Sequence, residues 1–216
     1  MRSFWRTLGR ATVRDIALVC AAVSLVGVSY GATAVTDGLP LWLPVVLGLL
    51  VVAASSEFMF IGIVAAGGNP FAAVLAGLLL NARHLPFGLG LPDVLGRGPR
   101  RLLGVHLMND ETVVFARAQP DRARASAAYW ACGLGILLSW PLGTVVGGLA
   151  GTFIDDSAPL GLDAVFPAVL LALVLPALRE HRVSAVAGAV VAVATTPFLP
   201  IGLPVLLALS VLAVAR

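Results

Sequence analysis

Ionisable and polar side chains are grouped within an otherwise apolar stretch in the first half of the chain. Ser56 and Glu57 follow one long apolar run, and Asn81, Arg83 and His84 end the next one. A charged residue at the centre of a membrane helix costs about 2.5–3.5 kcal/mol on insertion scales, so such residues usually serve a substrate or an ion. A carboxyl, a guanidinium and an imidazole in these surroundings predict binding of a charged solute or transfer of protons.

Arg83 and His84 are neighbours with different expected roles. The planar guanidinium of Arg83 matches a carboxylate in a two-pronged fit, although an arginine at a helix end can also reach lipid head groups. The imidazole of His84 could carry a coupling proton, because histidine changes charge near physiological pH. The alternative for His84 is a neutral ring that is hydrogen-bonded to the backbone at a helix break.

Glu57 has several possible partners. It could pair with Arg83, bind the ammonium group of a substrate or take up a proton, since the charge state of a buried carboxyl depends on what surrounds it. An ion pair that only joins two helices is the alternative. Ser56 and Asn81 are further candidates for substrate binding, although the amide of Asn81 could instead satisfy backbone groups at a helix break.

Asp110 and Glu111 form a second acidic group within a short amphipathic segment at 106–118. Consecutive helical residues point to different faces, so these carboxylates could line a gate or could lie on a solvated helix face. Both interpretations remain open from the sequence.

The chain offers no catalytic, metal-binding or nucleotide-binding motif. No His-x-x-x-His or paired-Asp spacing suited to a metal ion is present, and without lysine the chain cannot carry a Gly-x-x-x-x-Gly-Lys phosphate loop. Cys20 and Cys132 lie in apolar segments, where cysteine is typically a small packing residue. We therefore expect no enzyme activity, no metal and no cofactor. An intramembrane enzyme would have only Ser55 and Ser56 beside Glu57.

The composition is that of an integral membrane protein. The 216 residues are 59% hydrophobic and 12% charged, with a mean hydropathy of +0.99, whereas a soluble domain is about a quarter charged. Residues 45–54 and 165–175 are almost unbroken apolar runs, unlike the alternating strands of a barrel. The net charge of +3 comes from arginines at segment ends, which membrane topology explains without nucleic acid. We predict a single all-α transmembrane domain over residues 1–216.

The apolar segments predict a polytopic bundle of about six (five to seven) transmembrane helices in a lipid bilayer. They are residues 16–34, 41–66, 71–91, 125–153, 163–178, 183–199 and 201–215. Residues 1–14 are basic and amphipathic, which places the N-terminus on the cytoplasmic side of the cell (inner) membrane. Gly143, Gly147 and Gly151 recur every four residues and predict close contact with another helix.

The middle of the chain does not fit a simple path of crossings. Gly67, Gly68, Asn69 and Pro70 must interrupt a helix. With Asp37 outside and the arginines at 97–101 inside, the number of crossings between them must be odd, yet two apolar segments lie there. We favour a broken or re-entrant segment around residues 55–92, with breaks expected at residues 55–57 and near Pro86. The alternative is that residues 106–118 cross the membrane.

Several blocks of the sequence resemble the AzlC family, the large subunit of branched-chain amino-acid exporters. Residues 80–88 (Leu-Asn-Ala-Arg-His-Leu-Pro-Phe-Gly) resemble the family's Asn-x-Arg-His-x-x-Tyr-Gly signature, which is the most specific match. Residues 53–58 resemble its Ala-Gly-Ala-Ser-Gln-Phe block, with Glu57 where the family more often has Gln. Residues 109–112 resemble its Thr-Asp-Glu-Ser block. Residues 140–144 and 161–167 resemble two further blocks.

The resemblance implies a secondary transporter that exports branched-chain or similar neutral amino acids (Leu, Ile, Val). It also implies energy from an ion gradient, for which we expect protons, and a small AzlD-like membrane subunit as partner. Arg83 would then meet the substrate carboxylate, and Glu57 the ammonium group, with His84 or Glu57 in proton coupling. A subunit that only assists assembly, without transporting, is the alternative.

Overall fold

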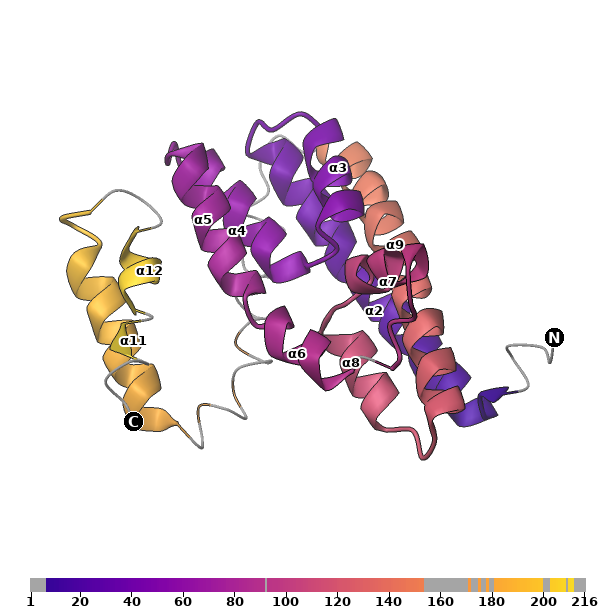
Figure 1. Ribbon diagram of the computed structural model, residues 1–216. Coiled ribbons are helices and arrows are strands. Elements are labelled where there is room, and N and C mark those ends of the chain that lie inside the picture. Colours follow the sequence, from indigo (N-terminus) through magenta and orange to yellow (C-terminus); the bar gives the residue numbers. More distant parts are fainter. Residues whose placement is uncertain are drawn as a thin grey trace.

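The computed structural model describes residues 7–91, 93–153 and 181–199, together with 171, 175, 178, 203–208, 210 and 211. Every regular element in these parts of the chain is a helix, which confirms the all-α prediction (Figure 1). Most of the expected span at 163–178 lies outside the described residues. The helices are α2 (Arg10–Thr36), α3 (Trp42–Leu50), α4 (Ala54–Ala65), α5 (Pro70–Asn81), α6 (His84–Gly90), α7 (Pro99–His106), α8 (Asp110–Arg117), α9 (Arg122–Gly151), α11 (Arg182–Thr195) and α12 (Leu203–Ala208).

Helices α2 and α9 form the central pair of the fold. They have 27 and 30 residues and are two of the three described helical stretches long and apolar enough to cross a membrane, the third being Pro70–Gly90, which comprises α5 and α6. The pair runs parallel, since Gly143 meets Ser24 and Gly147 meets Val28. A Cβ atom at Gly147 would overlap the backbone carbonyl of Val28. The glycine repeat therefore makes the close helix contact predicted for it.

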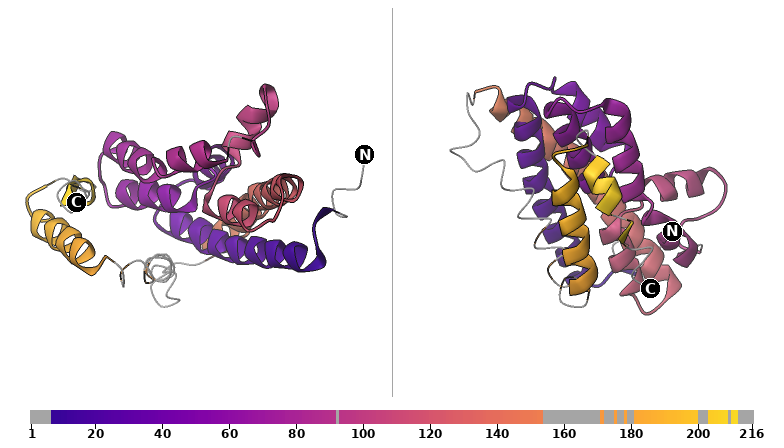
Figure 2. Two further views of the ribbon diagram at one scale, coloured as in Figure 1. Left: turned by 60° about the horizontal axis from the view of Figure 1, so that its bottom comes forward. Right: turned by 90° about the vertical axis from the view of Figure 1, so that its left-hand side faces the viewer.

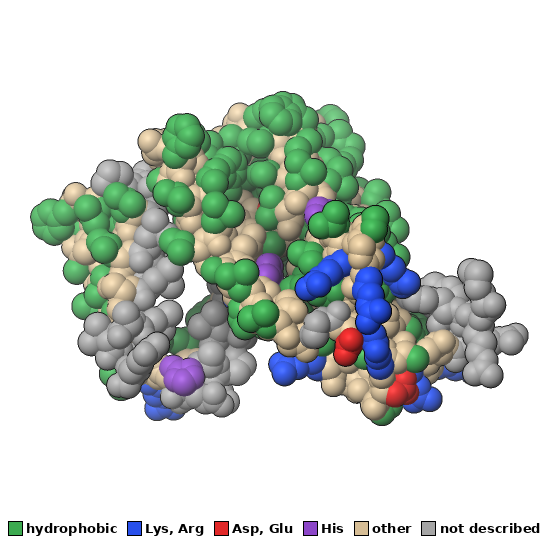
Figure 3. All heavy atoms as spheres, in the orientation of Figure 1, with side chains coloured by type: hydrophobic (Ala, Val, Ile, Leu, Met, Phe, Trp, Pro, Cys, Tyr) green, Lys and Arg blue, Asp and Glu red, His purple; other side chains and the backbone are tan. Residues whose placement is uncertain are grey.

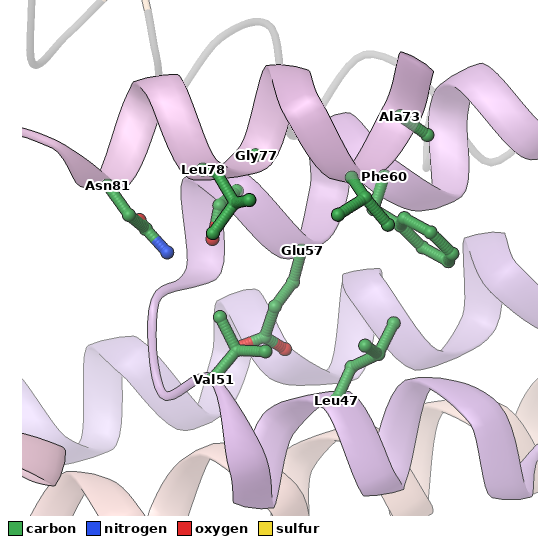
Figure 4. Close-up of a pocket in the computed structure, with 10 residues that line it drawn as sticks. Leu47, Val51, Glu57, Phe60, Ala73, Gly77, Leu78 and Asn81 are labelled. Atoms are coloured by element: carbon green, nitrogen blue, oxygen red, sulfur yellow. The ribbon is translucent and has the colours of Figure 1, made fainter. Parts of the chain in front are cut away.

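Helices α3 and α4 form a hairpin that enters and leaves the bundle at the same end. In Figure 4 the chain runs from Leu47 in α3 to Val51 just beyond its end, α4 runs back from Glu57 to Phe60, and α5 reverses direction again. The break lies at Val51–Ala53 rather than at the expected residues 55–57, which form the first turn of α4. Val52 has φ +53°, a left-handed conformation that β-branched residues rarely adopt. The span expected at residues 41–66 is therefore a hairpin of two short helices, and α4 is the part of it that falls within the broken or re-entrant segment expected around residues 55–92.

The connection from α4 to α5 follows the sequence prediction. Gly67 has φ +76°, and the side chain of Asn69 accepts a hydrogen bond of 2.8 Å from the backbone N–H of Phe71. Pro70 stands in the first turn of α5, where its missing N–H has no helical partner to lose.

The second break lies one turn before the position expected from Pro86. Helix α5 ends at Asn81, and α6 begins at His84. The ring of a proline clashes with the carbonyl four residues earlier, which here belongs to Ala82. The break therefore falls at Ala82 and Arg83, and Pro86 itself lies in the first turn of α6.

Helix α8 runs the opposite way to α4. Its first turn lies beside the middle of α9, where Thr112 contacts Gly133, and a short loop joins its end to the start of α9. Helices α4 and α8, which we call the half-length helices, thus begin in the middle of the bundle and lead to opposite ends of it (Figure 1).

The outer parts of the molecule divide by polarity. Hydrophobic side chains cover the upper part of the face in Figure 3, whereas arginine side chains gather towards the lower end, around α7 and the start of α9. The exposed arginines there include Arg97, Arg100, Arg101, Arg122 and Arg124. Helices α11 and α12 pack on each other beyond α5 (Figures 1 and 2). Cations at one end of an apolar bundle fit an all-α membrane protein.

Candidate functional site

The three helix breaks meet around one polar cavity of about 160 Å³. The α3–α4 break contributes Val52 and Ala53, the α5–α6 break contributes Arg83, and the start of α8 contributes Asp110. Its full lining is Val23, Val52, Ala53, Ala54, Ser55, Arg83, Asn109, Asp110, Glu111, Ile136 and Trp140. Irregular backbone inside a membrane protein is tolerated where it lines such a cavity, because the cavity solvates the freed groups.

Arg83 connects all three elements. Its Nη2 atom lies 2.7 Å from Oδ2 of Asp110 and donates a hydrogen bond of 2.9 Å to Oγ of Ser55. The side chains of Arg83 and Asp110 keep 36% and 45% of their surface exposed, so both remain accessible from the cavity. The Nε atom of Arg83 is buried and has no partner among the described residues.

Two helix N-termini open onto this cavity. Residues at the starts of α4 and α8, Ser55 and Asp110 among them, line it. Helix α8 has a reciprocal cap, in which Asn109 Oδ1 accepts from Thr112 N–H at 2.9 Å and Thr112 Oγ1 accepts from Asn109 N–H at 3.0 Å. Free N–H groups at a helix start carry partial positive charge and favour an anion.

The predicted acidic residues of α8 belong to the same cavity as Arg83. Asp110 and Glu111 both line it, so the two carboxylates stand opposite the guanidinium rather than on a remote face. The cavity thus combines hydrogen-bond donors with hydrogen-bond acceptors. A ligand that carries both charges, such as an amino acid, matches that combination.

Glu57 does not pair with Arg83 in this structure. Its side chain is 1% exposed, Oε1 accepts from Ala53 N–H at 3.0 Å, and Oε2 accepts from the indole N–H of Trp140 at 2.9 Å. The ring of Trp140 stacks on Tyr30, with centroids 5.2 Å apart. Glu57 therefore ties the α3–α4 hairpin to α9 from a position next to the polar cavity.

A second, apolar cavity of about 140 Å³ lies between α3, α4 and α5 (Figure 4). Its walls include Leu47, Val51, Phe60, Val74 and Leu78, and Glu57, Ser56 and Asn81 also line it. Ser56 and Asn81 thus line the apolar cavity, whereas Arg83 lines the polar one. The hydroxyl of Ser56 donates to Ala53 O at 2.8 Å, and Asn81 Oδ1 is buried without a partner in the described chain.

His84 begins α6 directly after Arg83. Its Nε2 atom is buried with no hydrogen-bond partner in the described parts, and its ring lies 6.0 Å from that of Phe87. The backbone hydrogen bond considered for a structural His84 is therefore not made by Nε2. Among the described residues, no group of three or more His, Cys, Asp or Glu side chains could hold a metal ion.

Sequence reasoning missed three residues of the site. Ser55 accepts from Arg83, Trp140 holds Glu57, and Val52 adopts the left-handed backbone at the break. Trp140 could have been identified from its residue type, because a buried indole N–H requires a hydrogen-bond acceptor. Glu57 is one of the few side chains in the apolar segments that can accept. Ser55 was named only for the alternative of an intramembrane enzyme, and nothing in the local sequence singled out Val52.

Comparison with known proteins places this arrangement in a family. The family described as AzlC protein matches residues 18–154, the part of the chain that contains both cavities. The branched-chain amino acid transport protein AzlC of Bacillus subtilis (strain 168) is 26% identical over 156 residues, which cover 71% of this chain. The match spans 61% of that protein's length. No solved structure matches the chain. The match over residues 18–154 shows that the chain belongs to the AzlC family.

Proposed function

We propose that this protein is a secondary-transporter subunit that exports branched-chain or similar neutral amino acids across the cytoplasmic membrane. The observation that carries the proposal is the polar cavity in which Arg83 and Asp110 lie 2.7 Å apart and both remain partly exposed. The name of the Bacillus subtilis relative, a branched-chain amino acid transport protein, supports the class of substrate.

The two charges of an amino acid find partners in this cavity. The α-carboxylate meets Arg83 and the N-terminal turn of α4, because a guanidinium and free backbone N–H groups both favour an anion. The α-ammonium group meets Asp110, which the substrate partly releases from Arg83. Glu111 lies beside Asp110 in the cavity wall and completes the acceptor side. This assignment transfers to Asp110 the ammonium contact that the sequence suggested for Glu57.

The apolar cavity supplies a place for the aliphatic side chain. An engineered cavity of about 150 Å³ with Leu, Ile and Phe walls binds benzene, and the cavity here has a similar volume of about 140 Å³ with similar walls. A branched four-carbon side chain is of that size. Only the Val51–Ala53 break and the first turn of α4 separate the two cavities, since Ser55 lines one and Ser56 the other.

Proton movement is the proposed source of energy. His84 adjoins Arg83 at the break, and Glu57 lies between the two cavities, so either group can change its charge next to the substrate. Asp110 and Glu111 would also act as a gate, because release of the Arg83–Asp110 pair loosens α8 from the α5–α6 break.

The orientation and the partner complete the proposal. The arginines near α7 and the start of α9 fit the cytoplasmic side under the positive-inside rule, which also places the N-terminus inside. A small AzlD-like membrane subunit is the proposed partner, and the exposed apolar surface of α5, with Phe71 at 81% exposure, offers room for a helix or for lipid.

Reconstitution tests the proposal. The purified chain, with and without a small AzlD-like membrane protein, is placed in liposomes loaded with labelled leucine, isoleucine or methionine, and a pH gradient is imposed. We expect gradient-driven flux that a protonophore abolishes. Absence of flux for all three amino acids, with and without the partner, would overturn the proposed function. Flux that is independent of this chain would assign it the assembly role instead.

A further inference from the structure

Asn109 stands at the start of α8, where only one of the two polar atoms of its side-chain amide has a hydrogen-bond partner among the described residues. Its side chain is 5% exposed, and its Oδ1 atom caps the helix by accepting from Thr112 N–H. Its Nδ2 atom is buried and has no partner among the described residues. The residue lines the polar cavity beside Arg83. A buried amide normally satisfies its donors, because an unmet donor is costly.

The orientation of this amide follows from the cap. Thr112 N–H can only donate, so the atom that faces it must be the oxygen, and the amide nitrogen must be the atom left over. Arg83 Nε is likewise a buried donor without a partner in the described chain. Two unmet donors on the wall of one cavity, beside a helix start, are suited to an anionic oxygen ligand.

We propose that the side-chain amide of Asn109 binds the substrate carboxylate together with Arg83. This inference rests on the proposed function. It adds Asn109 to the binding site, although helix capping alone would explain why an asparagine stands at this position. The carboxylate bridges Asn109 Nδ2 and Arg83 Nε, so it links α8 to the α5–α6 break while Asp110 turns to the ammonium group. Asn109 thereby discriminates amino acids from amines that lack a carboxylate.

Two substitutions separate the donor from the cap. In Asn109→Asp the remaining oxygen still caps α8, since Asp is as good an N-cap as Asn, but a negatively charged acceptor replaces the donor. Asn109→Ser also keeps a capping oxygen and adds no charge. Thr112→Ala is the matched control, because it removes a hydroxyl of the same reciprocal cap and leaves the Asn109 amide in place.

The experiment measures the KM for leucine in proteoliposomes and the unfolding temperature of each variant. We expect Asn109→Asp and Asn109→Ser to raise KM about tenfold or more, as loss of a hydrogen bond to a charged group does, with little change in unfolding temperature. Thr112→Ala should lower the unfolding temperature and keep the wild-type KM. Leucinamide lacks the carboxylate. It should therefore inhibit leucine transport by Asn109→Asp at least as strongly as it inhibits leucine transport by the wild type.

The outcomes distinguish this inference from the proposed function. A wild-type KM for leucine in both Asn109 variants would show that Asn109 is a helix cap only, and the carboxylate contact would be wrong. Equal losses of leucine and leucinamide binding in the variants would also contradict it, since the effect would not depend on the carboxylate. Absence of leucine flux in the wild-type protein would overturn the proposed function itself.

Discussion

A single nitrogen atom of Arg83, Nη2, lies 2.7 Å from Oδ2 of Asp110 and 2.9 Å from Oγ of Ser55. Arg83 stands in the α5–α6 break, Ser55 in the first turn of α4, and Asp110 in the first turn of α8. The arginine therefore joins the starts of two half-length helices that run in opposite directions. A ligand that competes for Arg83 acts on both helices at once, which is the arrangement that a transport cycle needs.

Loss of the acidic partner should impair transport. In Asp110→Asn the guanidinium keeps Ser55 but loses its charged partner, and the substrate ammonium group loses its carboxylate. We expect Vmax/KM for leucine to fall about tenfold or more, as for other charged contacts. Asp93→Asn is the control, because it breaks an ion pair with Arg122 that is exposed on both sides, and neither residue lines the cavity. Equal transport by Asp110→Asn and Asp93→Asn would remove Asp110 from the site.

Glu57 and Trp140 should behave as one unit. In Glu57→Gln an NH2 group replaces one of the two carboxylate oxygens, so either Ala53 N–H or the indole N–H of Trp140 faces a donor and loses its acceptor. We expect each of Glu57→Gln and Trp140→Phe to lower the free energy of unfolding by about 1–3 kcal/mol. The double variant should cost about 1–2 kcal/mol less than the sum.

Thermal unfolding of the four proteins in one detergent measures this coupling. Trp140→Phe removes the indole N–H, so no donor at position 140 needs an acceptor. In the double variant the amide oxygen of Gln can therefore accept from Ala53 N–H without leaving another donor unpaired. Strictly additive costs would mean that the 2.9 Å contact between Trp140 and Glu57 contributes nothing to stability.

Val52 should reverse the usual order of alanine and glycine. At φ +53° an L side chain costs roughly 1–2 kcal/mol that glycine does not. Val52→Ala and Val52→Gly both remove the two buried γ-methyl groups and differ only in the Cβ atom, so the left-handed backbone should dominate their difference. We expect Val52→Gly to unfold at a higher temperature than Val52→Ala, whereas glycine elsewhere is typically the less stable of the two. The usual order would show that the break does not hold Val52 in this conformation.

Much of the fold could be predicted because its signals are local. The Gly67–Pro70 turn, the apolar helices and the glycine contacts of α9 each follow from residue types within a few positions. Counting crossings also favoured a broken or re-entrant segment around residues 55–92. The break at Val51–Ala53 could not be located, because Val and Ala carry no signal for a loop and tertiary packing sets it.

The sequence predicted which residues belong to the candidate site better than it predicted which of them contact each other. Arg83, Asp110 and Glu111 were identified separately, but which acid meets Arg83 depends on the path of α8, which lies far along the chain. Ser56 and Asn81 proved to line the apolar cavity rather than the polar one. One residue of helix rotation, 100° or so, separates Ser55 from Ser56 and decides the cavity that each faces.

Phe60 should set the size of the side chain that the protein accepts. Phe60→Ala enlarges the apolar cavity, so Vmax/KM for phenylalanine relative to leucine should rise about tenfold, in line with the discrimination that apolar pockets achieve. The ratio of two substrates cancels any loss of folded protein. Phe71→Ala, at a position 81% exposed, should leave the ratio unchanged. An unchanged ratio in Phe60→Ala would separate the apolar cavity from the substrate path.

The most direct test of the account is isoleucine counterflow by Arg83→Gln in proteoliposomes that contain equal amounts of wild-type and variant protein. Counterflow requires substrate binding and exchange but no ion gradient, so it reports on the site alone. Arg117→Gln, an exposed arginine at the far end of α8, is the control for loss of one positive charge. We predict that Arg83→Gln loses counterflow at isoleucine concentrations that saturate wild type, while Arg117→Gln retains it. Counterflow by Arg83→Gln with the wild-type KM and rate would contradict the account.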